Sequence, residues 1–234
     1  ATQVLILYLI AAVGFVADKS KIYKQIDAKK LVDLLFNLIL PFAIINTFLS
    51  MERTPQRIKG LIISFALAIL THVLGAVISM FCFKKRDVYQ RGIYSYAMTF
   101  SNAAFLALPL AQSVVGDEGV FYCSCYVAVF NTFAFTYGIY QISGKTAKIN
   151  AKKLIFNPGT IGVLIGAPIF LLNITLPEII QTPLTHMANM NTPLAMLLFG
   201  TYISKTNFKT MFKQGNMYVT ALFKLVVLPI ITIL

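Results

Sequence analysis

Long apolar runs separated by short polar links form the dominant pattern of this chain. A run of about 20 apolar residues can cross the hydrocarbon core of a membrane as an α-helix. Such runs recur along the whole sequence, which predicts an all-α integral membrane protein. We expect eight transmembrane helices, over residues 1–17, 31–50, 60–83, 92–116, 119–143, 158–176, 179–203 and 215–234.

The fourth run, over 92–116, contains no charged residue, but it does not read as one regular helix. Ser101 and Asn102 place polar side chains near its middle, and Pro109 lacks the N–H group that a helix interior uses. We predict two half-helices with an unwound link between Asn102 and Pro109; a proline kink in a continuous helix is the alternative. Unwound backbone at this depth is tolerated where it faces protein or a wet cavity, as in transporters.

Composition narrows the class of protein further. Hydrophobic residues make up 58% of the chain and charged residues 12%, which excludes an ordinary soluble domain. The net charge of +12 is concentrated in the links, so it indicates membrane topology and not nucleic-acid binding. The chain has no zinc-protease, serine-hydrolase or phosphate-loop motif, and its acids lie in links or at span ends. We therefore expect no enzymatic activity, no cofactor and no bound metal.

The positive charges alternate from one side of the membrane to the other. Four links, over 18–30, 84–91, 144–157 and 204–214, hold sixteen lysines and arginines, whereas the opposite links hold three, all within 51–59. Cytoplasmic links of membrane proteins are enriched in lysine and arginine. The pattern predicts a multi-pass plasma-membrane protein with its N-terminus outside.

Two short matches suggest an internal repeat. Pro41-Phe-Ala-Ile-Ile resembles Pro193-Leu-Ala-Met-Leu, and Gly14 precedes Pro41 by the 27 residues that separate Gly166 from Pro193, so both matches share an offset of 152. The matching spans run in opposite directions, which predicts inverted five-helix repeats. The expected division is a first repeat over 1–143, a cytoplasmic linker over 144–157 and an incomplete second repeat over 158–234.

Several motifs in this order and spacing resemble the auxin efflux carrier family of membrane transporters, and in particular its bacterial permeases. The motifs are Ser101-Asn102-Ala-Ala-Phe-Leu-Ala-Leu-Pro109-Leu, Val129-Phe130-Asn131, Asn157-Pro158, Thr192-Pro193-Leu-Ala and Lys224-Leu-Val-Val-Leu-Pro229.

The resemblance implies a fold like that of sodium/proton antiporters, with ten spans of which the fourth and ninth are broken and cross. It implies a scaffold of spans 1, 2, 6 and 7, a moving transport unit made from the others, and a homodimer. We expect this chain to stop before spans nine and ten, which would supply the second broken helix.

The broken span would also supply the substrate site. The half-helix beginning at Pro109 directs free N–H groups and a partial positive charge toward the break, which suits a small organic anion such as a carboxylate. Asn102 is the strongest candidate because its carboxamide both donates and accepts; helix repair is its alternative role. The other substrate-binding candidates are Ser101, Pro109, Asn131, Asn191 and Thr192, with helix packing as the alternative for the polar ones.

Two ionisable residues inside the spans are candidates for coupling transport to a proton or a sodium ion. His72 and Lys224 lie 152 residues apart, so the repeat makes them equivalent. Ionisable groups within a membrane are functional candidates, and a histidine can carry a proton near neutral pH. The alternatives are neutral packing for His72 and, for Lys224, a side chain extended toward the cytoplasmic surface.

These patterns predict a secondary transporter that moves a small organic anion by alternating access within the lipid bilayer. The alternative is a membrane receptor or sensor that binds a small organic acid without moving it. A Gly-xxx-Gly pair, Gly162 and Gly166, predicts close helix packing either at a dimer interface or within one subunit.

Overall fold

The computed structural model describes residues 2–22, 25–85, 87–101, 106–143, 156–208, 212–213 and 215–233, which contain helices and no strand. Helix is present in each of the eight apolar runs that the sequence marks. Most of the predicted linker, 144–155, and the candidate Asn102 lie outside the described residues.

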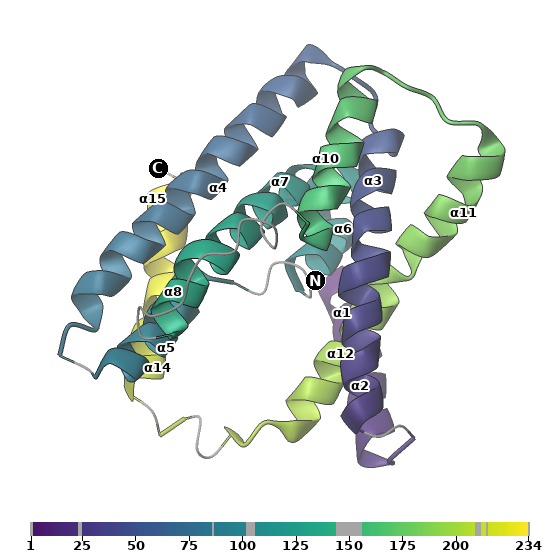
Figure 1. Cartoon of the computed structure of the whole chain (residues 1–234). Helices are drawn as coiled ribbons and strands as arrows, with labels where there is room; N and C mark the ends of the chain where they lie inside the picture. The colour runs from purple at the N-terminus through teal and green to yellow at the C-terminus, as the bar shows by residue number, and fades with distance from the viewer. Residues whose placement is uncertain are drawn as a thin grey trace.

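The helices are labelled as in Figure 1. Their bounds in the first part of the chain are α1 Thr2–Lys19, α2 Gln25–Leu34, η1 Leu35–Ile39, α3 Leu40–Ser50, α4 Pro55–Cys82, α5 Val88–Thr99 and α6 Leu108–Val115. The later ones are α7 Asp117–Phe133, η3 Ala134–Gly138, α8 Ile139–Ile142, α10 Pro158–Leu171, α11 Glu178–Asn189, α12 Asn191–Lys205, α14 Gly215–Leu222, η4 Phe223–Val227 and α15 Leu228–Ile233.

Four helical stretches within the described residues are long and apolar enough to cross a membrane. Their exposed side chains are largely hydrophobic, as lipid-facing helices require. The fold is therefore that of an all-helical membrane protein, while the count of eight spans stays a prediction. The four stretches are Thr2–Lys19, Ala28–Ser50, Pro55–Cys82 and Asp117–Ile142.

Prolines within the apolar runs are accompanied by wide helical turns. The π-helical turns η1 and η4 each end two residues before a proline, at Pro41 and Pro229 respectively. A proline ring pushes on the carbonyl of the preceding turn, and a π turn accommodates that displacement without ending the helix. Pro41 and Pro229 are therefore accommodated without a break, and Pro109 likewise follows two π-helical residues, Leu106 and Ala107.

Helices from the two halves of the sequence pack closely on each other. α1 lies along α12, where Gly14 faces the backbone of Leu197 and Gly200 faces the backbone of Ala11. A methyl group on either glycine would overlap a backbone carbonyl, so only glycine permits this approach.

A second close pair, α3 and α10, uses the predicted Gly-xxx-Gly motif. Gly162 lies against Ile44, and Gly166 lies against the ring of Phe48. The motif therefore serves packing within the chain. The pairs α1 with α12 and α3 with α10 are those that an inverted repeat would generate, although the repeat itself stays a prediction.

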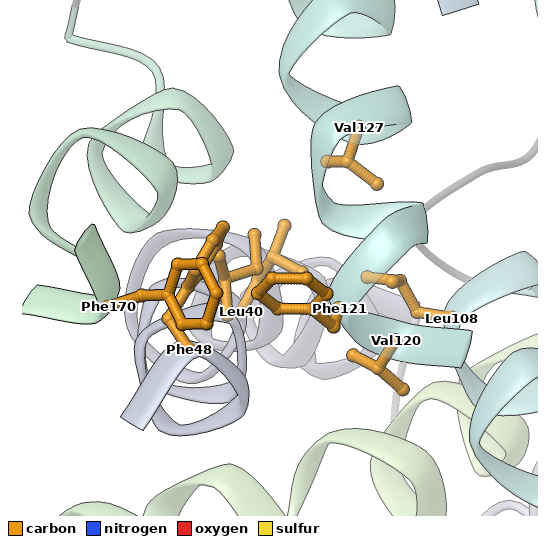
Figure 2. Close-up of a cluster of buried hydrophobic side chains, with 8 residues drawn as sticks. Leu40, Phe48, Leu108, Val120, Phe121, Val127 and Phe170 are labelled. Carbon is orange, nitrogen blue, oxygen red and sulfur yellow. The ribbon is translucent and has the colours of Figure 1, made fainter. Parts of the chain in front are cut away.

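An aromatic cluster ties these helices to α7. The Phe121 ring centroid lies 5.1 Å from that of Phe48 and 4.9 Å from that of Phe170, in edge-to-face geometry. Figure 2 shows the three rings meeting between α3, α7 and α10, with Leu108 of α6 close to α7. Edge-to-face pairs add about 0.5 to 1.5 kcal/mol each beyond the area they bury.

The remaining helices form a second group. α4 packs against α5 and α7, and α5 packs against α8 and α14. In Figure 1, α4, α5, α14 and α15 lie together on the opposite side of the molecule from α1, α2, α11 and α12. The interrupted helix lies between the two groups, because α6 contacts α1, α7 and α12 while α5 belongs to the second group.

Candidate functional site

The helix of the fourth run is interrupted, as predicted, but the interruption begins earlier than expected. α5 ends at Thr99, and Phe100 is extended with φ −105° and ψ 130°. The expected break between Asn102 and Pro109 therefore starts before Asn102. At the far side, Leu106 and Ala107 are π-helical and continue into α6, so the helix resumes before Pro109 and the predicted unwound link does not extend to it.

Contacts from distant parts of the chain explain the early end of α5. The Phe100 ring lies between aromatic neighbours, with centroid distances of 4.5 Å to Tyr96 and 5.7 Å to Phe130. The Phe100 carbonyl accepts a hydrogen bond from the ammonium group of Lys224. An extended residue at 100 accommodates the contacts with Phe130 and Lys224, and neither partner is visible in the sequence around Asn102.

Lys224 thus neutralises the carbonyl end of the first half-helix. The last carbonyls of a helix lack intrahelical partners and carry about half a negative charge. A buried ammonium group needs acceptors of this kind. In this structure the Lys224 ammonium group bonds to Phe100, which does not support the alternative of a side chain extended toward the cytoplasmic surface.

His72, on α4, lies near the same end of α5, beside Phe100. Its side chain is fully buried, and Nδ1 lies 2.7 Å from the carbonyl oxygen of Ala68, one turn earlier. Its ring lies 5.8 Å from the Phe100 ring and 5.0 Å from the Tyr126 ring. Nε2 has no hydrogen-bond partner in the part of the chain that the structure describes. Phe100 therefore connects the two candidates for ion coupling.

A large cavity opens beside Asn131 between α2, η1, α5, α7, η3 and α10. We call it the Asn131 cavity; its volume is about 460 Å³. Asn131 itself is 9% exposed. The residues lining the cavity include Asp33, Phe36, Asn37, Leu40, Tyr96, Phe130, Asn131 and Asn157.

A second cavity lies between α3, α6, α7, α11 and α12. We call it the Asn191 cavity; its volume is about 270 Å³. Its lining is mostly polar, with Asn46, Thr47, Gln112, Asp117, Asn189, Asn191 and Thr192 contributing.

The two cavities lie at corresponding places on the predicted repeat. The offset of 152 residues that defines the repeat also relates lining residues of one cavity to lining residues of the other. The pairs are Phe36 with Ala188, Asn37 with Asn189 and Leu40 with Thr192.

The structure therefore separates the predicted site residues into groups. Asn131 lines one cavity, while Asn191 and Thr192 line the other. Ser101 follows the end of α5 and hydrogen-bonds with Tyr126. Pro109 is buried at the start of α6.

Sequence reasoning missed several lining residues. Tyr96 and Gln112 each lie on one of the two half-helices, and Asp117 begins the next helix. For Tyr96 and Gln112 the available signal was their position on the broken span, and Asp117 immediately follows that span.

Apolar helices, with cavities that carry polar side chains on both flanks of an interrupted helix, define the class as a membrane transporter. A protein-family comparison supports this class: the family described as "Membrane transport protein" matches residues 1–234. The chain belongs to this family, which is the auxin efflux carrier family of transporters. The search of curated proteins gives no significant match.

Proposed function

We propose that the protein is a secondary transporter that moves a small organic anion, such as a carboxylate, across the plasma membrane by alternating access. The observation that carries the proposal is the interrupted helix with a cavity on each flank. A receptor that binds an organic acid without moving it is not favoured, because the family is one of transporters.

The charge at the interruption supports an anionic substrate. Lys224 offsets the negative carbonyl end of α5, whereas the second half-helix, which includes Leu106 and Ala107, directs its positive amino end toward the interruption. Free N–H groups at a helix start bind carboxylates and phosphates. Asn102, in the link itself, stays the proposed polar contact, with Ser101 beside it.

The cavities support alternating access. In this proposal the substrate enters one cavity, contacts Asn131 or Asn191 with Thr192, and leaves through the other after one helix group moves past the other. The scaffold would be α1 to α3 with α10 to α12, and the transport unit would be α4 to α8 with α14 and α15. The lysine-rich links support an orientation with the Asn131 cavity toward the cytoplasm and the N-terminus outside.

Replacing Asn131 with alanine tests the substrate path. We expect uptake of small carboxylates into vesicles to fall at least tenfold, because a carboxylate loses a hydrogen bond worth about 1.5 to 3 kcal/mol. Initial rates with a panel of dicarboxylates and auxin-like acids provide the measurement. Asn173→Gly is the matched control, since Asn173 is exposed, lies on neither cavity and has a positive φ of 54° that glycine tolerates. Equal flux in the two variants would remove Asn131 from the path.

Replacing His72 with glutamine tests proton coupling. Glutamine keeps a polar group of similar reach but cannot take up a proton near neutral pH. We expect the rise or fall of transport between pH 5.5 and 8 to flatten in His72→Gln. A pH profile that keeps the wild-type shape at reduced amplitude would assign His72 to packing among its aromatic neighbours.

A further inference from the structure

We propose that the Asn191 cavity binds a monovalent metal cation, held by the side-chain carbonyl of Asn191 and attracted by the carboxylate of Asp117. Nothing in the transport proposal requires a cation at this place. Three observations point to it. One buried acceptor has no hydrogen-bond partner, one carboxylate has no ion-pair partner among the described residues, and the cavity lining has no cationic side chain.

The first observation is the Asn191 side chain itself. Asn191 is 7% exposed, and its Oδ1 atom has no hydrogen-bond partner among the residues described. A buried acceptor without a partner is costly, so a ligand is expected to satisfy it. A carbonyl oxygen can be satisfied by a cation or by a donor, but not by a carboxylate substrate.

The position equivalent to Asn191 on the predicted repeat is apolar. The offset of 152 residues relates Asn191 to Ile39, which is fully buried and apolar. Packing on the scaffold therefore does not call for a polar group at this position. The predicted repeat therefore gives the Asn191 carbonyl no polar equivalent at position 39, which favours a ligand specific to this cavity.

The second observation is the charge of Asp117, which lines the same cavity. Its Oδ1 atom accepts a hydrogen bond of 2.9 Å from Nε2 of Gln112. None of the ion pairs formed by the described residues includes it. The nearby guanidinium of Arg57 lies 3.6 Å from Glu118 and also pairs with Glu52. The carboxylate of Asp117 is therefore free to attract a cation into the cavity.

The remaining lining suits a partly hydrated ion. Asn46 accepts a hydrogen bond of 2.8 Å from Thr185 and keeps a second lone pair on the same oxygen, and Thr47 and Thr192 add hydroxyl groups. A volume of about 270 Å³ holds a cation with several waters, at about 30 Å³ for each water. A single carboxylate balances one positive charge, whereas calcium sites use several carboxylates. We infer a monovalent ion, with sodium as the probe.

Thermal unfolding of the purified full-length protein in detergent tests the site without measuring transport. Sodium chloride is titrated against choline chloride at constant ionic strength. We expect sodium to raise Tm by about 5 to 10 °C at a hundred times its Kd, because a ligand that binds only the folded state stabilises it. Choline is too large for a carbonyl-lined ion site and is expected to leave Tm unchanged.

Four variants decide whether the shift comes from this cavity. Asn191→Leu and Asp117→Asn are expected to lose the sodium-dependent shift, whereas Asn191→Asp keeps an acceptor and retains it. Asp33→Asn, which removes the carboxylate that lines the Asn131 cavity, is the matched control and is expected to retain it. Asp117 is exposed, so Asp117→Asn stays informative even where Asn191→Leu fails to fold.

A sodium shift that survives in Asp117→Asn, or that choline reproduces, would overturn the proposal. Absence of any sodium shift in the unmodified protein would do the same. Coupling of this cation to transport would rest on the proposed function, but its binding would not. Vesicles that take up carboxylates while the protein shows no sodium shift would reject the cation site and leave the transporter intact.

Discussion

Replacing Lys224 with methionine is expected to reduce transport to less than a tenth of the wild-type rate. The ammonium group bonds to the Phe100 carbonyl at the end of α5. Methionine has a side chain of similar length but no charge, so the carbonyl end of α5 loses its counter-charge. Hydrogen bonds to charged groups contribute about 1.5 to 3 kcal/mol, and an anionic substrate nearby would also lose a favourable field. Initial rates of carboxylate uptake in vesicles measure the effect.

Two further variants separate this role from a general loss of charge. Lys59→Met removes the same charge from an exposed position near the start of α4 and is expected to transport normally. Lys224→Arg restores a cation and is expected to recover part of the activity. Full activity in Lys224→Met, with unchanged expression, would show that the contact with Phe100 is not needed.

Replacing Gly200 with alanine is expected to cause the largest loss of stability. The added methyl group would overlap the carbonyl of Ala11 and crowd the backbone N of Phe15, so α1 and α12 would have to separate. Backbone atoms cannot move aside as side chains do, and overpacking typically costs about 1 to 3 kcal/mol, so we expect a loss near the upper end of that range. The midpoint of thermal unfolding and the yield of monodisperse protein after size-exclusion chromatography report the change.

Gly215→Ala supplies the control for that experiment. Gly215 begins α14 and has no neighbouring atom within 4 Å of the position an added methyl would take. Alanine favours helix over glycine by up to about 1 kcal/mol, so this variant is expected to be as stable as the parent or slightly more so. A Gly200→Ala protein that unfolds with the same midpoint as Gly215→Ala would contradict the close packing of α1 on α12.

The interruption of the fourth helix shows what the local sequence can and cannot predict. Pro109 and the polar pair Ser101 and Asn102 indicated that the helix breaks, and it does. They did not place its start, because α5 ends where Phe100 meets partners on α7 and η4. Pro41 and Pro229 show that a proline in an apolar run does not by itself predict a break, because each is accommodated by a π turn.

The candidate site shows a similar division. Asn131, Asn191 and Thr192 were predicted from the sequence as substrate-binding candidates, and in the structure each lines a cavity. The sequence grouped them in one substrate site, whereas the structure divides them between two cavities. Which polar residues share a cavity depends on how helices pack, and spacing along the chain carries no such information.

The sequence by itself determined the class: apolar runs of membrane length, an interrupted fourth run and motifs of one transporter family. These properties are local, because helix formation in lipid, a proline and a short motif each act within a few turns of backbone. The tertiary structure alone decided which residues meet: Lys224 with Phe100, Gly200 with Ala11, and Asn191 with Asp117 in one cavity. Those contacts join residues far apart in the chain, and they exist only once the helices pack at fixed distances and angles.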